Sequence, residues 1–238
     1  MTAPDRTVRR SIRRHLDIGS LKHDPLSICR HGSAVYHEKI STIDKTRSAV
    51  LSVEGGAMIY TVECSFADPG SEAEWNDFYS LDKLPALISV TGFQTSQRFK
   101  ALSGGCPVYL ALHSIDGLDI LMGKEYRQKG GGNFARWQQH ITDWHRNLYG
   151  GIDRAPSIGE GEYLALSATG PEPLLRLGLT PSAMQAVAME KVPEHRWLAK
   201  VERGTLPDIE HLPEGVHVYV RMTAQLTKDD EAAVGKVR

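Results

Sequence analysis

The chain lacks any apolar run near the roughly 18 residues that a membrane-spanning helix needs. Its charges almost cancel, since 28 Lys and Arg residues against 29 Asp and Glu residues leave a formal net charge of -1. This balance gives no reason to expect nucleic acid as a partner. The basic residues near the N-terminus are followed by no apolar core, so no secretory signal is predicted. We therefore expect a cytoplasmic protein with no membrane partner.

Cysteine is scarce as well. Cys29, Cys64 and Cys106 do not form a closed disulfide set, and no CxxC or Cys/His zinc spacing is present. The sequence contains no two-His-plus-carboxylate set with diagnostic spacing, no dinucleotide fingerprint and no Ser/His/Asp elbow. The glycine run at residues 130–132 lacks the ending of a P-loop and is interpreted as a flexible loop. We therefore expect no required metal and no cofactor.

Residues 1–56 differ from the rest of the chain. Tyr36 is their only aromatic residue of the Phe, Tyr or Trp type, and their aliphatic residues show no sustained period. Such a segment buries little surface, so we expect an N-terminal extension that is weakly ordered or peripheral. Its arginine run (residues 6–14) indicates a tail for nucleic acid or an anionic surface, or a short solvated amphipathic helix, which we prefer. Another interpretation starts the native protein at Met58.

From residue 57 the pattern becomes regular. Alternation predicts strands over 57–67, 93–101 and 107–114. Between the first two, Ser71 and Glu74 form a capping box for a helix that Pro85 should end by about Lys83. An apolar stripe predicts a second helix that begins near Asn133 and ends at Gly150-Gly151; its members are Phe134, Trp137, Ile141, Trp144 and Leu148. The order β-α-β-β-α lacks one strand of a ferredoxin-like unit.

This region carries a recognisable pattern over about residues 57–148. Its members are Trp75, Phe78-Tyr79, Lys83-Leu84-Pro85, Val90, Gly92-Phe93 and Arg98-Phe99. The pattern resembles the EthD-like family of the dimeric α/β-barrel superfamily, whose members do unrelated chemistry. One departure stands out, because the family usually has His before Leu-Pro and this chain has Lys83. The resemblance implies a sheet with helices on one face and a barrel lumen on the other.

The second half looks like a loose repeat of the first. Strands are predicted over 162–168, 195–202 and 216–226, and residues 172–190 should be partly helical with a break at Pro181. Strand starts near 57, 93 and 107 then correspond to starts near 161, 195 and 216. We predict an α+β fold, a ferredoxin-like dimeric α/β barrel made of two fused halves, 57–151 and 152–238. The two sheets could face each other within one chain or pair across a homodimer, and we expect a homodimer.

The implied architecture also suggests where a site would lie. Polar residues on the strand faces away from the helices should line the barrel and bind substrate: Glu63, Arg98, Tyr109, His217, Tyr219 and Arg221. A mostly apolar cavity with a few polar groups is the usual form of a small-molecule site. The alternative is that these residues are simply solvated on a half-covered sheet.

Three residues are candidates for catalysis. His113, expected on the same barrel face, has an ordinary pKa near 6.5 and could move a proton either way. Tyr79 and Lys83 lie where the resemblance places the active region, and a buried Lys83 could act as a base or form a Schiff base. The simpler interpretations are a structural histidine and a surface lysine.

The leading functional hypothesis is a cofactor-independent enzyme. It would act on a small cyclic, aromatic or polyketide-like compound by proton transfer, as an isomerase, cyclase or lyase. A second hypothesis is a non-catalytic module for ligand binding or assembly. The presence of Lys83 where the family usually has histidine favours it. A third is a haem protein with His140, His145 or His217 as axial ligand.

Overall fold

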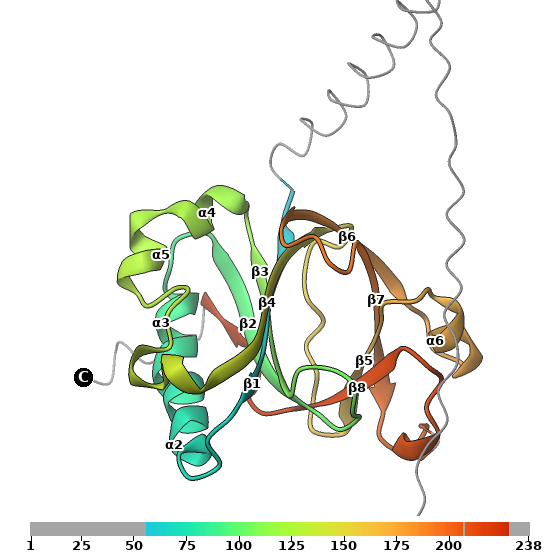
Figure 1. Cartoon of the computed structure of the whole chain (residues 1–238). Coiled ribbons are helices and arrows are strands. Elements are labelled where there is room, and N and C mark those ends of the chain that lie inside the picture. Colours follow the sequence, from blue (N-terminus) through green and yellow to red (C-terminus); the bar gives the residue numbers. More distant parts are fainter. Residues whose placement is uncertain (1–55, 207, 229–238) are drawn as a thin grey trace, which may run out of the picture. The chain divides into compact units, whose positions relative to one another are not determined.

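The computed structural model describes residues 56–206 and 208–228. The expected extension over 1–56 lies outside this range apart from Gly56. Nine strands of the described part form one sheet in the order β3-β1-β4-β6-β7-β5-β8-β2-β9, and β2 also pairs with β3. This last pairing closes eight strands into an antiparallel barrel, while β9 lies along β2 (Figure 1). No helix in residues 56–206 and 208–228 has the length and apolarity to cross a membrane.

The strands are β1 (Met58–Phe66), β2 (Phe93–Ala101), β3 (Tyr109–Ile115), β4 (Ile141–Gly150), β5 (Glu162–Ser167), β6 (Ser182–Met189), β7 (His195–Glu202), β8 (Val216–Arg221) and β9 (Leu226–Thr227). The α-helices are α2 (Glu72–Asp77), α3 (Leu84–Ile88), α4 (Leu118–Met122), α5 (Lys124–Gln128) and α6 (Glu172–Arg176). A π-helix, η1 (Phe78–Lys83), joins α2 to α3, and 3₁₀-helices form η2 (Ala135–His140) and η3 (Ile209–His211).

The barrel consists of two ferredoxin-like halves. Strands β1 to β4 lie in the order β4-β1-β3-β2, and strands β5 to β8 repeat it as β8-β5-β7-β6. The halves join through antiparallel pairings of β4 with β6 and of β2 with β8. The predicted fold class is therefore confirmed, and the two sheets face each other within one chain. The predicted strand correspondence, which matched β2 to β7 and β3 to β8, was wrong. In the structure β2 matches β6 and β3 matches β7. The error arose because β4 and β6 lie in segments that were predicted to be helical.

Strand β4 replaces most of the helix predicted from Asn133 to Leu148. Its pairing with β1 shifts register between Glu63 and Ser65, and Asp143 there has a φ of 47°. Such a bulge adds one residue to the strand. Ile141 and Trp144 therefore pack on the same core although they are three residues apart. The bulge gave a strand the apolar spacing of a helix.

The helical segment after β1 also differs from the prediction. Ser71 precedes α2, but its hydroxyl donates to Asp68 (2.6 Å) and forms no capping box. The helix does not end at Lys83 and continues through Pro85. Proline removes a donor and clashes with the carbonyl four residues back in an α-helix. Here the preceding turn is a wider π-helix, in which the amide of Leu84 donates to Tyr79 five residues back.

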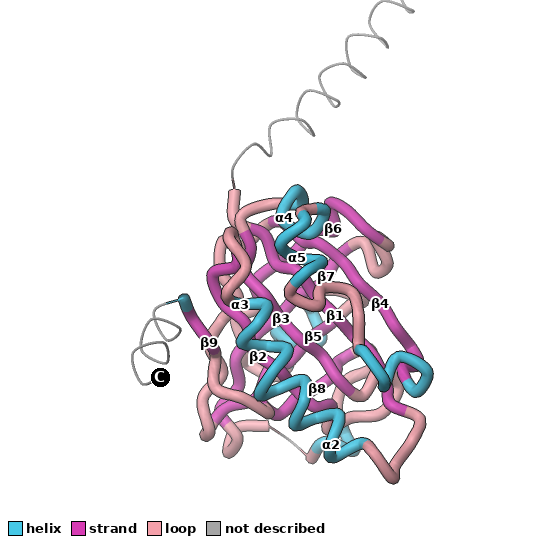
Figure 2. Tube along the Cα trace, turned by 90° about the vertical axis from the view of Figure 1, so that its left-hand side faces the viewer, coloured by secondary structure: helices cyan, strands magenta, loops and turns pink. Residues whose placement is uncertain are grey.

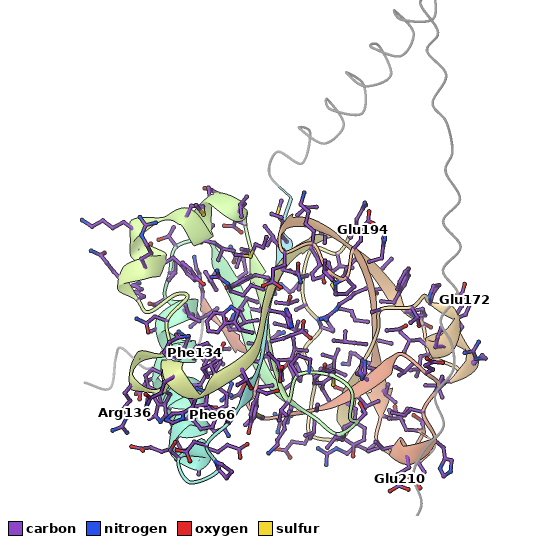
Figure 3. All side chains as sticks on the ribbon, in the orientation of Figure 1. Phe66, Phe134, Arg136, Glu172, Glu194 and Glu210 are labelled. Carbon is purple, nitrogen blue, oxygen red and sulfur yellow. The ribbon has the colours of Figure 1, made fainter. Side chains whose placement is uncertain are left out.

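Three apolar cores lie in the part of the chain that the structure describes. One fills the space between the helices and the outer face of the first half, where Phe66 stacks on Trp75. A second fills the barrel around Leu112 and Leu164, and a third lies under α6 around Ala199. The helices from α2 to α5 cover the strands of the first half (Figure 2). Figure 3 shows Phe66 and Phe134 in this helical region, whereas Glu172, Glu194 and Glu210 lie at the periphery of the second half.

Candidate ligand pocket between the helices and the sheet

The barrel lumen receives only part of the predicted site. Tyr219 is buried in the barrel core, and Glu63 is buried there in an ion pair with Arg196. His217 is half-buried on the same face of β8. Arg221 lies near its end and pairs with the exposed carboxylate of Glu160 at 2.5 Å.

Arg98, Tyr109 and His113 do not point into the barrel. Each packs on the helix side of its strand: Tyr109 belongs to the helix–sheet core, and the His113 ring stacks on Tyr60 at 5.5 Å. Both faces of β3 are buried, so apolarity could not tell them apart. The alternate residues Leu110 and Leu112 point into the barrel core instead.

Arg98 holds the π-helix against the sheet. Its fully buried guanidinium donates to the backbone carbonyl (3.1 Å) and side-chain oxygen (2.9 Å) of Asn76 and to the Ser80 hydroxyl (2.8 Å). The ring of Tyr79 lies 4.1 Å away. Burial lowers the pKa of Arg98 to about 10, so it stays charged near neutrality. Arg98 therefore positions the segment that carries Tyr79 and Lys83.

The π-helix turns Tyr79 and Lys83 toward the sheet, and both side chains are buried. π-helical turns are rare and occur often at functional sites. A pocket opens beside them, lined by Tyr60, Val62, Tyr79, Lys83, Leu87, Tyr126, Gly132, Phe134 and Trp144. Its free volume is about 10 Å³, close to that of one water molecule. A larger ligand would require the loop at residues 130–134 to move.

Lys83 is the only charged residue in this lining. Its ammonium donates to the backbone carbonyls of Gly130 and Asn133 in the loop over the pocket. It also lies 4.8 Å from the centre of the Phe134 ring. Burial lowers the pKa of Lys83 from 10.5 to about 8. This side chain can therefore change protonation state within the range in which many enzymes work.

Tyrosine hydroxyls supply the other polar groups. Those of Tyr60 and Tyr126 are 3.0 Å apart and form a buried hydrogen bond. Burial raises the pKa of Tyr60 and of Tyr79, so both remain protonated near neutrality. The Tyr79 hydroxyl has no hydrogen-bond partner among the described residues. Buried polar groups usually have partners, so Tyr79 offers a free hydrogen-bonding group at the wall.

His113 lies behind Tyr60 and outside the pocket lining. Its Nδ1 is 2.8 Å from the Ser96 hydroxyl, and its Nε2 has no partner in the described residues. Burial, with the nearby charge of Lys83, lowers the pKa of His113 to about 3. The imidazole is therefore neutral at pH 7, which removes the titration near neutrality on which its expected role depended.

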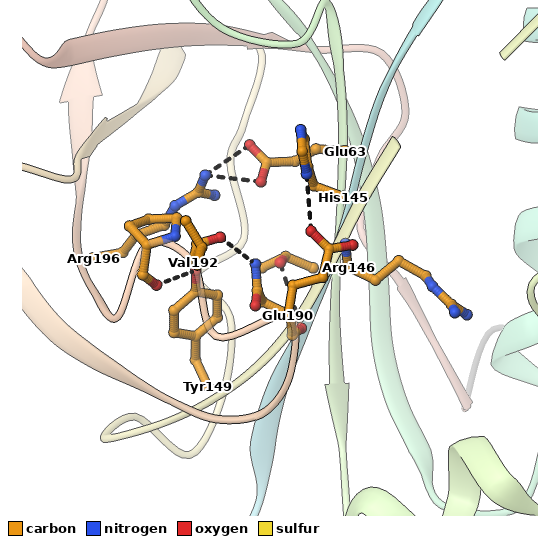
Figure 4. Close-up of polar contacts among 10 residues, drawn as sticks. Glu63, His145, Arg146, Tyr149, Glu190, Val192 and Arg196 are labelled. Carbon is orange, nitrogen blue, oxygen red and sulfur yellow. Dashed lines mark hydrogen bonds and ion pairs between the residues drawn. The ribbon is translucent and has the colours of Figure 1, made fainter. Parts of the chain in front are cut away.

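The barrel holds a separate polar network that links the halves (Figure 4). Arg196 on β7 donates to both carboxylate oxygens of Glu63 on β1, at 2.9 and 2.8 Å. Tyr149 donates to the backbone carbonyl of Pro193 at 3.1 Å, and Asn147 donates to that of Val192 at 2.8 Å. These contacts tie β1 and β4 to the second half, so Glu63 is held in a structural ion pair.

Sequence reasoning missed several pocket residues. Trp144 was expected in the apolar stripe of a helix, and Tyr60 and Tyr126 were not among the predicted site residues. The side chain of Arg146, which interacts with both Tyr60 and Tyr126, was not singled out. No local signal marks them, because they come from β1, α5 and β4 and meet only in the folded chain.

The histidines considered as haem ligands are dispersed. His145 bonds to Glu190 at 2.9 Å, His140 packs against Phe66, and His217 lies on the barrel face. The pocket lining contains no histidine that could serve as an axial ligand. These residues do not fit a haem. Residues 56–206 and 208–228 also contain no cluster of three or more His, Cys, Asp or Glu side chains suited to a metal ion.

No protein-family profile matches the chain, and no curated protein matches it significantly. Among solved structures, an anthrone oxidase-like protein is 7% identical, with 72% of this chain and 93% of that chain covered and a TM-score of 0.44. A haem-binding protein from Thermus thermophilus is 7% identical, with coverages of 77% and 95% and a TM-score of 0.38. Chlorite dismutase from Candidatus Nitrospira defluvii is 10% identical, with coverages of 75% and 95% and a TM-score of 0.37. Likeness this slight carries no information about reaction or ligand, and EthD-like membership stays a prediction.

Proposed function

We propose that this chain is a cofactor-independent enzyme that moves a proton on a small cyclic or aromatic compound bound between the helices and the sheet. The observation that carries the proposal is Lys83, a buried amine in an aromatic pocket whose lining contains no carboxylate. Aromatic walls with a few polar groups suit a small ring. Lys83 stands where the EthD-like pattern has histidine, so a different base would occupy the same place.

The chemistry follows from the protonation states. Unprotonated Lys83, accessible because burial lowers its pKa to about 8, would take a proton from a carbon next to a substrate carbonyl. The electrons of the broken C–H bond move to the carbonyl oxygen, and a neutral tyrosine hydroxyl donates a hydrogen bond to it. Return of the proton from Lys83 to another atom gives the isomerised product. No outside oxidant or reductant is needed.

Ligand entry requires a change at the loop over the pocket. Lys83 binds two carbonyls of this loop, and Gly132 at the opening is exposed. We infer that the loop moves outward and that these two hydrogen bonds break when a ring enters. The freed amine would then face the ligand.

The test is exchange of carbon-bound protons for deuterium, followed by NMR in D₂O with 2-tetralone as probe. Wild type should speed the exchange, with a rate that rises through an apparent pKa of about 8. Removal of a general base typically costs about 10²-fold or more, so Lys83→Met should lose most of the acceleration. Lys200→Met, which removes an exposed lysine paired with Glu162, is the matched control and should behave as wild type.

The non-catalytic alternative uses the same pocket. The observation that favours it is the engagement of Lys83 by two loop carbonyls, which would suit a closed binding site. In that case the probe would bind without accelerated exchange. Equal exchange by wild type and Lys83→Met would overturn the proposed catalytic role.

A further inference from the structure

Arg146 stands beside the pocket as a second cation. It lies on β4 between Trp144 and Leu148, which both pack on the helix–sheet core. Alternate residues of a strand share a face, so the Arg146 side chain also lies on the helix side. Its backbone amide binds the Glu190 carboxylate at 3.0 Å, but the guanidinium extends away from Glu190 (Figure 4).

Two observations place the guanidinium at the pocket. Arg146 interacts with the hydroxyls of Tyr60 and Tyr126, which form one wall. Its Nη1 is also 3.3 Å from the position that a Cβ on Gly132 would take, at the pocket opening. The side chain is half-buried and forms no ion pair with the other described residues.

The side-chain charges beside the pocket are therefore positive, since neither Lys83 nor Arg146 forms an ion pair with the other described residues. Lys83 and Arg146 flank the aromatic walls, and the pocket lining includes no Asp or Glu. Asp143 lies close enough to Cys64 to interact with it electrostatically, but Asp143 is exposed to solvent. Arginine presents a planar fork of donors that matches a carboxylate in a bidentate geometry.

We propose that the pocket selects an aromatic acid, a planar ring that carries a carboxylate, with Arg146 and the Tyr60–Tyr126 pair as the carboxylate-binding group. This inference rests on the proposed function, because it assigns the ligand class of the same pocket. The ring would lie against Phe134 and Trp144, and the carboxylate would point toward the opening. Gly132 permits this approach because a side chain there would crowd the guanidinium.

The test compares benzoate with benzamide, its neutral analogue of the same shape, by ligand titration followed with NMR at low salt. Wild type should bind benzoate at least about tenfold more tightly, a difference of about 1.4 kcal/mol. In Arg146→Gln the preference should fall to about threefold or less, because only the charge of Lys83 remains. Arg146→Lys keeps the charge but lacks the fork and should lie between the two.

Controls separate this inference from the proposed function. Arg203→Gln removes an exposed arginine of the second half and should keep the full preference. Equal binding of the two probes by wild type would overturn the inference and leave the pocket intact as a ligand site. Absence of binding by both probes would overturn the inference, whereas deuterium exchange of 2-tetralone tests the proposed function separately. A preference that persists in Arg146→Gln would overturn the role of Arg146.

Discussion

The two halves of the barrel share one strand order but differ on their outer faces. The first half buries Lys83, Arg98 and His113 beneath a layer of helices. The second half covers its sheet with the five-residue helix α6 and loops, over a core that is apolar: Ala165, Leu174, Ala199, Val201, Val216 and Val218. The difference separates two tasks, since the first half carries the candidate chemistry and the second half closes the barrel.

Because one chain closes the barrel, a second copy of the chain has no strand to add to it. In this fold two sheets must face each other to bury the lumen, and here β5 to β8 provide the second sheet. A second copy is therefore not needed to complete the barrel. The expected homodimer remains a prediction, which native mass spectrometry can test.

The largest expected effect concerns the cores of the two outer faces. Trp75 is fully buried among aromatic rings, whereas Trp197 is half-buried against the apolar core of the second half. Trp75→Ala should lower the free energy of unfolding by about 3–5 kcal/mol, as is usual for a buried aromatic residue. Trp197→Ala should cost clearly less. Urea unfolding measures both, and equal losses would contradict the contrast between the faces.

The next effect tests the coupling of the halves. Arg196→Met leaves the buried carboxylate of Glu63 without its cation, which should cost about 3 kcal/mol. The double variant Glu63→Gln with Arg196→Met should recover much of this loss, because no buried charge remains. An additive loss in the double variant, seen by urea unfolding, would show that the pair does not couple the halves.

Lys83 should give the first half a distinct pH dependence. Its pKa falls from 10.5 to about 8 on folding, so the unfolded chain binds more protons between these pH values. The free energy of unfolding contributed by Lys83 should therefore rise with pH across this window, by at most about 3 kcal/mol. Lys83→Met should flatten this rise, whereas the exposed Lys200→Met should not. Parallel curves for wild type and Lys83→Met would contradict the burial of the amine.

The smallest effect concerns the loop over the pocket. A Cβ at Gly131 would meet the Tyr126 ring at 2.4 Å, whereas one at Gly104 meets nothing within 4 Å. Gly131→Ala should therefore cost about 1–2 kcal/mol through overpacking, and Gly104→Ala should cost less. Equal stability of the two variants in thermal unfolding would show that the loop does not pack on Tyr126 as described.

The sequence predicted the fold from features that are local. Alternation located β1, β2 and β3, and the Trp75 to Phe99 pattern pointed to the barrel architecture. The sequence-based prediction was wrong where pairing between distant segments determines the secondary structure. The bulge at Asp143 places apolar residues of β4 at the spacing typical of a helix. The π-helix before Pro85 lets the helical segment continue past this proline.

The candidate site was predicted only in part. Lys83 and Tyr79 were expected near the active region, and the structure brings both to one pocket. Tyr109 and His113 were assigned to the barrel as the more polar face of their strand, but β3 is buried on both faces, so polarity does not mark its barrel side. Tyr126 and Arg146 lie 66 and 86 positions from Tyr60, so only the tertiary fold brings them together.

The most direct test of the account uses the chain's four tryptophans. Trp144 lines the pocket, Trp75 and Trp137 belong to the same core, and Trp197 lies on the second half. The protein would be labelled with 5-fluorotryptophan, its four ¹⁹F signals assigned by single substitutions, and benzoate added. The Trp144 signal should shift most, and the Trp197 signal should stay fixed. A shift of Trp197 with Trp144 unchanged would place the ligand elsewhere and contradict the central claim.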